Sequence, residues 1–176
     1  MSEPFRIRPA TEADPPALLE IYRPFVEDSA VSFEMVAPTV EEFAARVRKA
    51  QTHWEWLVAE REGRCIGYAY GSSHRGRPGY RWSVEVSAYV DPSHHRQGIG
   101  RTLYLRLFEI LTDKGFCNAY AGITLPNEAS VALHRGVGFE PIGIFKAVGR
   151  KFGKWQDVAW FHRVLRDSPP SEPEAR

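Results

Sequence analysis

Two polar residues lie where acid–base chemistry would need them. Glu85 stands in the middle of the apolar run 82–90, where desolvation would raise the pKa of its carboxyl group towards that of a general base. His134 lies in a segment of helical spacing, and an imidazole, with an ordinary pKa of about 6.5, can exchange a proton near neutral pH. Each also has a structural interpretation: a glutamate on the solvated face of a strand, and a histidine hydrogen-bonded in the core. The residues alone leave both interpretations open.

The loop 94–101 joins a predicted strand to a predicted helix and carries Gly98 and Gly100. The first N–H groups of a helix have no partner within it and lie at the positive end of its dipole. This unit therefore predicts a site for an anion such as a pyrophosphate, to which Arg96 and Arg101 add positive charge. A Rossmann fingerprint is disfavoured, because no third glycine follows and no acidic residue closes the next strand.

Hydrophobic periodicity and capping signals predict the elements that hold these residues. Capping boxes begin at Thr11 and Thr39, and Pro24 should end or kink the first helix. Glu62-Gly63 predicts a hairpin, and Asn127 is the predicted cap of the last helix. The predicted strands are 5–8, 54–60, 64–70, 80–90, 118–124, 139–148 and 157–165, with 149–155 as the last connection; the helices run from about 12 to 24, 40 to 50, 102 to 114 and 128 to 135.

This order of elements predicts a mixed α+β domain in α/β/α layers with a partly parallel sheet, covering residues 3–166. A chain of 176 residues can bury a substantial core as one domain. Residues 167–176 are rich in proline and charge and have no apolar pattern, so we expect a disordered tail there.

Composition disfavours several classes of protein. A net charge of +1 provides no basic field for nucleic acid. No apolar run approaches the roughly 20 residues of a membrane span, and the first residues lack the apolar segment of a secretory signal. Cys65 and Cys117 lie far apart, as expected of reduced thiols. His94 and His95 have no further ligand at metal-binding spacing, so no metal is expected. We therefore expect a cytoplasmic, soluble protein.

Several motifs, in order, resemble one family from about Phe5 to Leu165. They are the loop 95–100, the pattern Asn127-x-x-Ser130-x-x-x-His134-x-x-x-Gly138-Phe139, the strand 84–90 and the segment 149–158. Together they resemble the GCN5-related N-acetyltransferases (GNAT), and more closely the phosphinothricin and methionine sulfoximine acetyltransferases among them. One position departs from the family pattern, since His95 stands where this loop usually has glutamine or arginine.

The resemblance implies the GNAT fold, with a mixed twisted sheet of about six to seven strands and about four helices. It also implies acetyl-CoA as co-substrate and no metal. The pyrophosphate would bind mostly backbone in the loop, so we expect binding to survive the change at His95, and the pantetheine would lie beside the strand that ends near Val90. The implied acetyl-CoA-binding residues are Ala88, Tyr89, Val90, His95, Arg96, Gln97, Gly98, Ile99, Gly100, Arg101, Asn127 and Ser130.

The implied reaction is direct transfer, in a ternary complex, of acetyl to the α-amine of a small acidic amino-acid analogue such as phosphinothricin, methionine sulfoximine or methionine sulfone. The amine must lose a proton before it attacks. Glu85 would accept that proton through a water, and His134 would be a second catalytic group whose direction of proton transfer stays open. An arginine fork suits a carboxylate or phosphinate. The implied acceptor-binding residues are Phe33, Arg75, Arg77 and Tyr80.

In relatives the acceptor site lies near a twofold interface, so the resemblance also implies a homodimer. The expected partner is otherwise a small amine, with neither nucleic acid nor membrane. Two alternatives remain open. One keeps the chemistry and changes the acceptor to another amino acid, a polyamine or a protein N-terminus. The other is a non-catalytic acyl-CoA-binding regulator, which the presence of both Glu85 and His134 disfavours.

Overall fold

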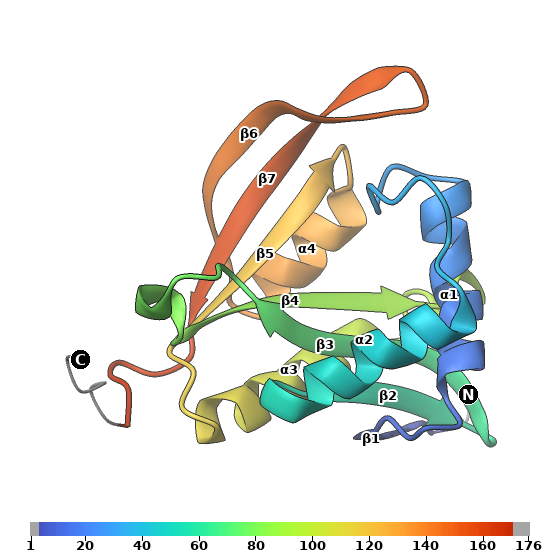
Figure 1. Ribbon diagram of the computed structural model, residues 1–176, viewed down its shortest axis with the longest axis horizontal. Helices are drawn as coiled ribbons and strands as arrows, with labels where there is room; N and C mark the ends of the chain where they lie inside the picture. Colours follow the sequence, from blue (N-terminus) through green and yellow to red (C-terminus); the bar gives the residue numbers. More distant parts are fainter. Residues whose placement is uncertain (1–3, 171–176) are drawn as a thin grey trace.

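A computed structural model describes residues 4–170, and within that range four α-helices surround one seven-stranded sheet (Figure 1). The strand order is β1-β2-β3-β4-β5-β7-β6. Of the predicted tail, residues 171–176 lie outside the described part of the chain, as does residue 3 of the predicted domain. The elements are β1 (Arg6–Pro9), α1 (Pro15–Glu27), α2 (Val40–His53), β2 (Trp56–Arg61), β3 (Arg64–Ser73), β4 (Ser83–Val90), α3 (Ile99–Asp113), β5 (Asn118–Leu125), α4 (Glu128–Gly136), β6 (Glu140–Lys151) and β7 (Lys154–Val164), with short 3₁₀ turns at Pro78–Tyr80 and Pro92–His94.

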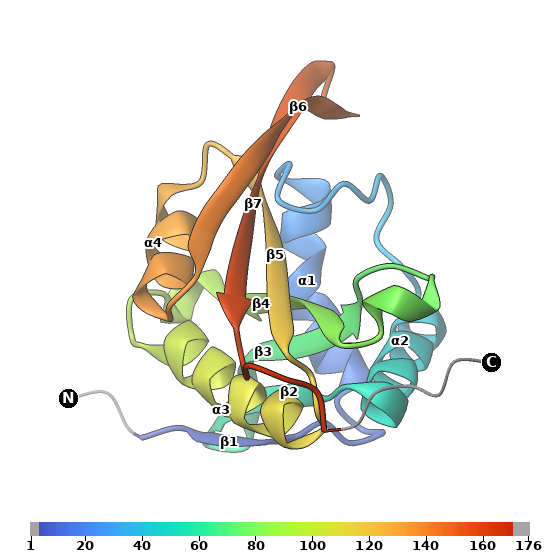
Figure 2. The ribbon, with the colours of Figure 1, turned by 90° about the vertical axis from the view of Figure 1, so that its left-hand side faces the viewer.

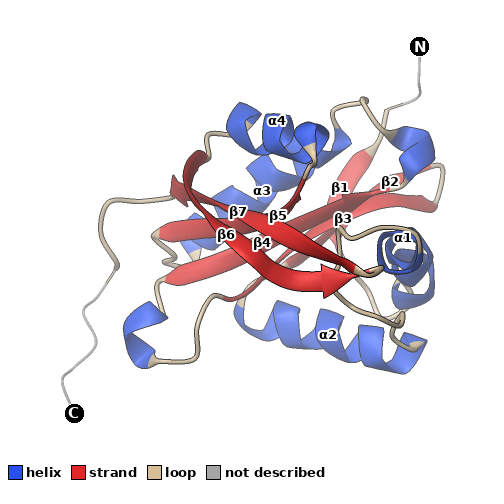
Figure 3. Ribbon diagram, turned by 90° about the horizontal axis from the view of Figure 1, so that it is seen from above, coloured by secondary structure: helices blue, strands red, loops and turns tan. Residues whose placement is uncertain are grey.

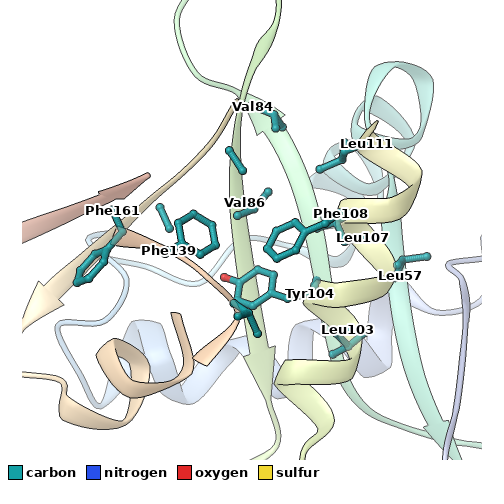
Figure 4. Close-up of a cluster of buried hydrophobic side chains, with 14 of the residues drawn as sticks. Leu57, Val84, Val86, Leu103, Tyr104, Leu107, Phe108, Leu111, Phe139 and Phe161 are labelled. Carbon is teal, nitrogen blue, oxygen red and sulfur yellow. The ribbon is translucent and has the colours of Figure 1, made fainter. Parts of the chain in front are cut away.

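The helices cover the two faces of the sheet in pairs, which confirms the predicted α/β/α layers. Helices α1 and α2 lie on one side and α3 and α4 on the other (Figure 3). Burial of apolar side chains drives each contact. On the α3 side the core includes Tyr104, Phe108 and Phe139 (Figure 4). On the α1–α2 side it includes Phe43 and Trp56. No helix within residues 4–170 has the length and apolar character needed to cross a membrane.

Side-chain capping explains two of the four α-helix starts within residues 4–170, those of α2 and α4. The box at Thr39 is confirmed, because its Oγ1 accepts from the Glu42 N–H and the Glu42 carboxylate accepts from the Thr39 N–H. The box at Thr11 is wrong. Asp14 is the N-cap of α1, but its carboxylate binds the Arg8 guanidinium at 2.7 and 2.8 Å and the Thr11 N–H rather than the helix. The pair with Arg8 therefore holds β1 to the start of α1.

Two predicted boundaries are also wrong. Pro24 does not end the first helix, since α1 continues to Glu27 and Val26, beyond the proline, is buried. The segment 149–155 is not a separate connection, since β6 and β7 run through it and turn only at Phe152 and Gly153, with φ of 50° and 74°. The resulting hairpin extends beyond the other strands (Figure 2).

Strands β4 and β5 form a V. They pair in parallel at three positions only, Ser83 with Asn118, Val84 with Ala119 and Glu85 with Tyr120, and then diverge (Figure 1). Beyond Glu85, β4 pairs with β3 alone, so the backbone edge of 86–90 that faces the V has no strand partner. The next segments, the loop before α3 and the start of α4, follow the open ends of the two strands.

Candidate active site

Glu85 occupies the apex of the V, as the last β4 residue paired with β5. Its neighbours Val84 and Val86 are buried in the core on the α3 side, so strand alternation places the Glu85 side chain on the opposite face. Its Oε1 lies 3.0 Å from Nδ1 of His74, and the side chain is 32% exposed. Burial raises the pKa of Glu85, while the hydrogen bond and charge of His74 and the charge of Arg75 act in the opposite direction. This carboxylate is placed to accept a proton from a group in the V.

His134 lies on the other face of the sheet. Its Nδ1 is 2.7 Å from the Ser130 carbonyl oxygen and must donate there, so in the neutral ring Nε2 accepts from the Tyr104 hydroxyl at 3.1 Å. The ring packs against Tyr104 and Phe139 and the residue is 5% exposed. Burial lowers the pKa of His134, although the bond to Ser130 opposes the shift. The structure thus does not bring His134 into contact with Glu85, and burial disfavours the charged form of the imidazole.

The loop before α3 has the backbone geometry of an anion cradle. Arg96 and Gly98 adopt left-handed φ angles of 62° and 77°, and Gly98 is the N-cap of α3. A glycine adopts this conformation without steric cost, whereas an arginine does so uncommonly. The N–H groups of the first turn of α3 have no acceptor within the helix. Together with the helix dipole, they form a site suited to a phosphate group.

Side chains in this loop are held by the protein itself. Nε2 of His95 lies 3.0 Å from the Val90 carbonyl oxygen, and Oε1 of Gln97 accepts from Arg61 at 2.8 Å. Arg101 donates to the carbonyl oxygen of Gly136. Ile99 and Gly100 are buried. His95 and Gln97 are therefore oriented by protein partners, while the backbone N–H groups and the other guanidinium N–H groups of Arg101 remain for an anion.

The remaining predicted donor residues gather at the open end of the V. Ala88, Tyr89 and Val90 follow Glu85 on β4, although the Tyr89 ring turns away into the α1–α2 core. Asn127 caps α4 by accepting from the Ser130 N–H at 3.1 Å, which confirms its predicted cap. The loop before α3 and the start of α4 thus follow the ends of β4 and β5 that diverge.

The predicted acceptor residues are only partly assembled. Arg75 and Tyr80 line a hollow of about 320 Å³ together with Trp54 and Ser73, and Arg77 is not among its lining residues. Trp54 and Ser73 also border a second, aromatic cavity of about 330 Å³, with Arg46 and Lys49 among its lining residues. Arginine or lysine side chains therefore line both hollows.

Phe33 is not among the residues that line these two hollows, and it lies on the connector between α1 and α2. A side chain at Gly149, on the β6–β7 hairpin, would overlap its ring. The hairpin and the connector thus pack directly on one another. The next residue, Glu34, is bound by Arg46 and by the Tyr22 hydroxyl at 2.6 Å.

Sequence reasoning missed two residues. His74 contacts Glu85, and the only sequence signal was a histidine among arginines in a loop. Lys151 is 2% exposed, and its Nζ donates to the carbonyl oxygens of Val26 and Ser32 at 2.5 and 2.7 Å. No local pattern indicates that contact. Within residues 4–170, no group of three or more His, Cys, Asp and Glu side chains is placed to hold a metal ion.

Comparison with known proteins agrees with this geometry. The model of the acetyltransferase (GNAT) domain family matches residues 7–160. Phosphinothricin N-acetyltransferase of Streptomyces viridochromogenes is 38% identical, covering 97% of this chain and 93% of the relative. The L-methionine sulfoximine/L-methionine sulfone acetyltransferase of Salmonella typhimurium is 35% identical, covering 90% and 94%. A Sinorhizobium meliloti phosphinothricin acetyltransferase, solved in complex with AcCoA, superposes with a TM-score of 0.90 at 37% identity, covering 96% of this chain and 92% of that one.

The chain belongs to the GNAT acetyltransferase family. It is an acetyltransferase, as the resemblance of its motifs implied.

Proposed function

We propose that this chain transfers acetyl from acetyl-CoA to the α-amine of a small acidic amino acid of the phosphinothricin or methionine sulfoximine kind, by direct attack in a ternary complex. The observation that carries the proposal is the position of Glu85 at the apex of the β4–β5 V. An anion-binding helix start lies at the open end of that V, and a hollow lined by Arg75 lies near its apex. The activities for which the two relatives are named support the choice of acceptor.

The donor side fits acetyl-CoA, which supplies the acetyl thioester. The unpaired β4 edge offers backbone groups to the pantetheine amides, and the first turn of α3 offers N–H groups to the pyrophosphate. We propose that the binding residues are Ala88, Tyr89, Val90, His95, Arg96, Gln97, Gly98, Ile99, Gly100, Arg101, Asn127 and Ser130. Most would act through backbone atoms, because their side chains have protein partners or are buried.

On the acceptor side, Glu85 would take the proton of the ammonium through a water, since burial raises the pKa of its carboxyl group and so its affinity for a proton. Among the arginines, Arg75 is better placed than Arg77 to bind the acceptor's anionic group, with Tyr80 beside it and Phe33 further out. His134 would handle a proton on the donor side. Because both ring nitrogens have protein partners, a proton would reach or leave His134 through the Tyr104 hydroxyl that bonds Nε2.

The experiment that tests the proposed function is an acceptor screen. Thiol release from acetyl-CoA should be rapid with phosphinothricin or methionine sulfoximine and slow with polyamines and peptide N-termini. Failure of both acidic analogues, alongside turnover of another amine, would overturn the acceptor assignment. If thiol release stayed at the background rate with every amine in the screen, the non-catalytic alternative would be favoured instead.

Arg75→Ala provides the specificity control for that screen. It should raise the KM for an acidic acceptor and leave the KM for an uncharged amine unchanged, because only the former presents an anion to the guanidinium. The parallel variant Arg77→Ala should have the smaller effect. Equal losses for charged and uncharged amines would show that Arg75 does not bind the acceptor.

We also propose that the protein is a homodimer. Strand β6 is an open edge of the sheet, and apolar side chains lie exposed along it and the adjoining hairpin. An exposed strand edge can pair with a strand of another chain, and in a homodimer the β6 edge of the second copy would be that strand. Light scattering should give twice the chain mass of 20.0 kDa; a single-chain mass at every concentration would contradict the proposal. The exposed residues are Ile142, Ile144, Phe145, Val148, Phe152 and Trp155.

A further inference from the structure

One row of paired residues crosses the sheet at the apex of the V. Ser72, Glu85, Tyr120 and His162 are partners in register across β3, β4, β5 and β7. Directly paired residues project to the same face of a sheet. His74 follows the end of β3 and folds back over this row. Its ring lies nearly parallel to that of Tyr120, at 4.4 Å between centroids and 13° between planes, while Nδ1 reaches Oε1 of Glu85 at 3.0 Å.

The plane of the His74 ring is fixed from several sides. Tyr80 meets the ring edge-on at 5.8 Å and 72°, and Trp160 does so at 6.3 Å and 74°. The side chain is 13% exposed. Because Tyr120, Tyr80 and Trp160 come from three different elements, rotation of the imidazole would disturb all three contacts. The ring is therefore held with Nδ1 directed at the carboxylate.

We propose that His74 is the positioning residue of the general base: it holds the Glu85 carboxylate in one orientation and sets its affinity for a proton. The proposal rests on the proposed role of Glu85. With hydrogen on Nδ1, His74 donates to Oε1 and stabilises the ionised carboxylate. Within residues 4–170, Oε2 makes no hydrogen bond, so that oxygen stays available for the proton that leaves the amine.

Other titratable groups face this pair. Arg75 adjoins His74, and its charge favours the ionised form of Glu85. Tyr80 and Tyr120 contact the imidazole. His162 stacks on Tyr120 at 5.0 Å and binds Oδ1 of Asn118 at 2.7 Å. His162 is thus a second histidine on the same tyrosine without a bond to Glu85, and it offers a matched control.

Substitutions can separate the stack from the hydrogen bond. His74→Phe keeps an aromatic ring on Tyr120 and removes the donor, so kcat should fall roughly 10- to 100-fold, with the KM for acetyl-CoA unchanged. The acid limb of the kcat/KM profile should move to higher pH, because the bond that favours ionised Glu85 is lost. His74→Asn offers an amide N–H near the Nδ1 position, so it should restore much of kcat and return the acid limb towards its original pH. His162→Phe should leave both unchanged.

A merely structural role gives a different pattern. His74→Phe and His74→Asn would then lose activity in step with their thermal stability, without movement of the acid limb, and that result would overturn the proposal. An unshifted limb in a fully stable His74→Phe enzyme would do so as well.

NMR titration of the Glu85 carboxyl group keeps the inference separate from the proposed acceptor. In the free protein, His74→Phe should raise the pKa of Glu85 further, because the hydrogen bond that favours the ionised carboxylate is removed. This measurement needs neither acceptor nor acetyl-CoA. If His74→Phe changes the titration of Glu85 but the enzyme turns over no acidic acceptor, the proposed function is wrong and the inference still holds. Identical titrations of Glu85 in the two proteins would overturn the inference.

Discussion

Replacing Glu85 with glutamine should lower kcat by roughly 10²- to 10⁴-fold, with the KM for acetyl-CoA little changed. Glutamine keeps the size of the side chain and an oxygen that can accept from His74, but it cannot take up the amine's proton. Glu62→Gln, at the exposed β2–β3 turn, should leave the rate unchanged. An undiminished rate in Glu85→Gln would remove this residue as the base.

The pH dependence gives that experiment a second readout. Catalysis needs Glu85 ionised, so kcat/KM should fall as the pH drops through the pKa of Glu85. Burial raises this pKa, which places the acid limb above the roughly 4.3 of an ordinary glutamate. The limb should be absent in Glu85→Gln. Residual activity with an unchanged acid limb would show that another group controls it.

His134→Asn addresses the second proton-handling residue in the same assay. Asparagine can still donate to the Ser130 carbonyl oxygen, but it leaves the Tyr104 hydroxyl without the Nε2 acceptor. If His134 takes part in the reaction, kcat should fall while the acid limb set by Glu85 stays in place. A loss of stability alone, with kcat retained, would identify His134 as a buried, hydrogen-bonded core histidine.

Signals confined to a few residues predicted much of the fold. The Thr39 box, the Glu62-Gly63 hairpin and the Asn127 cap each depend on contacts within four residues, and each is confirmed. Glu85 could be singled out because a carboxylate in an apolar strand is unusual, whichever strands lie beside it. Its place at the apex of the V depends on where β4 and β5 separate, which no local pattern encodes.

The residues that sequence reasoning missed or misplaced depend on distant contacts. His74 reaches Glu85 because the β3–β4 connection folds back over the sheet. Arg77 and Arg75 are equivalent by type, and only the path of that connection makes Arg75 line a hollow. The segment 149–155 contains two glycines and two lysines, which are poor strand formers, yet pairing with β7 and packing on Phe33 keep it in a hairpin.

Replacing Lys151 with methionine should reduce the free energy of unfolding by about 2–4 kcal/mol. Methionine keeps most of the aliphatic stem but leaves the buried carbonyl groups of Val26 and Ser32 without their donor. Val26 lies in the last turn of α1, where carbonyl groups lack helical partners and an ammonium also interacts favourably with the helix dipole. Urea unfolding at equal protein concentration measures the change.

The exposed Lys154, on the same hairpin, supplies the matched control, and Lys154→Met should leave the free energy of unfolding nearly unchanged.

The contact of Lys151 also joins the hairpin to the connector that carries Phe33 and Glu34, so its loss should loosen the acceptor side of the site. Well below the unfolding temperature, Lys151→Met should therefore raise the KM for the acceptor more than that for acetyl-CoA, whose proposed site lies at α3 and α4. Equal changes in the two KM values would show that the hairpin does not shape the acceptor site, and an unchanged stability would show that the buried ammonium contributes nothing to the fold.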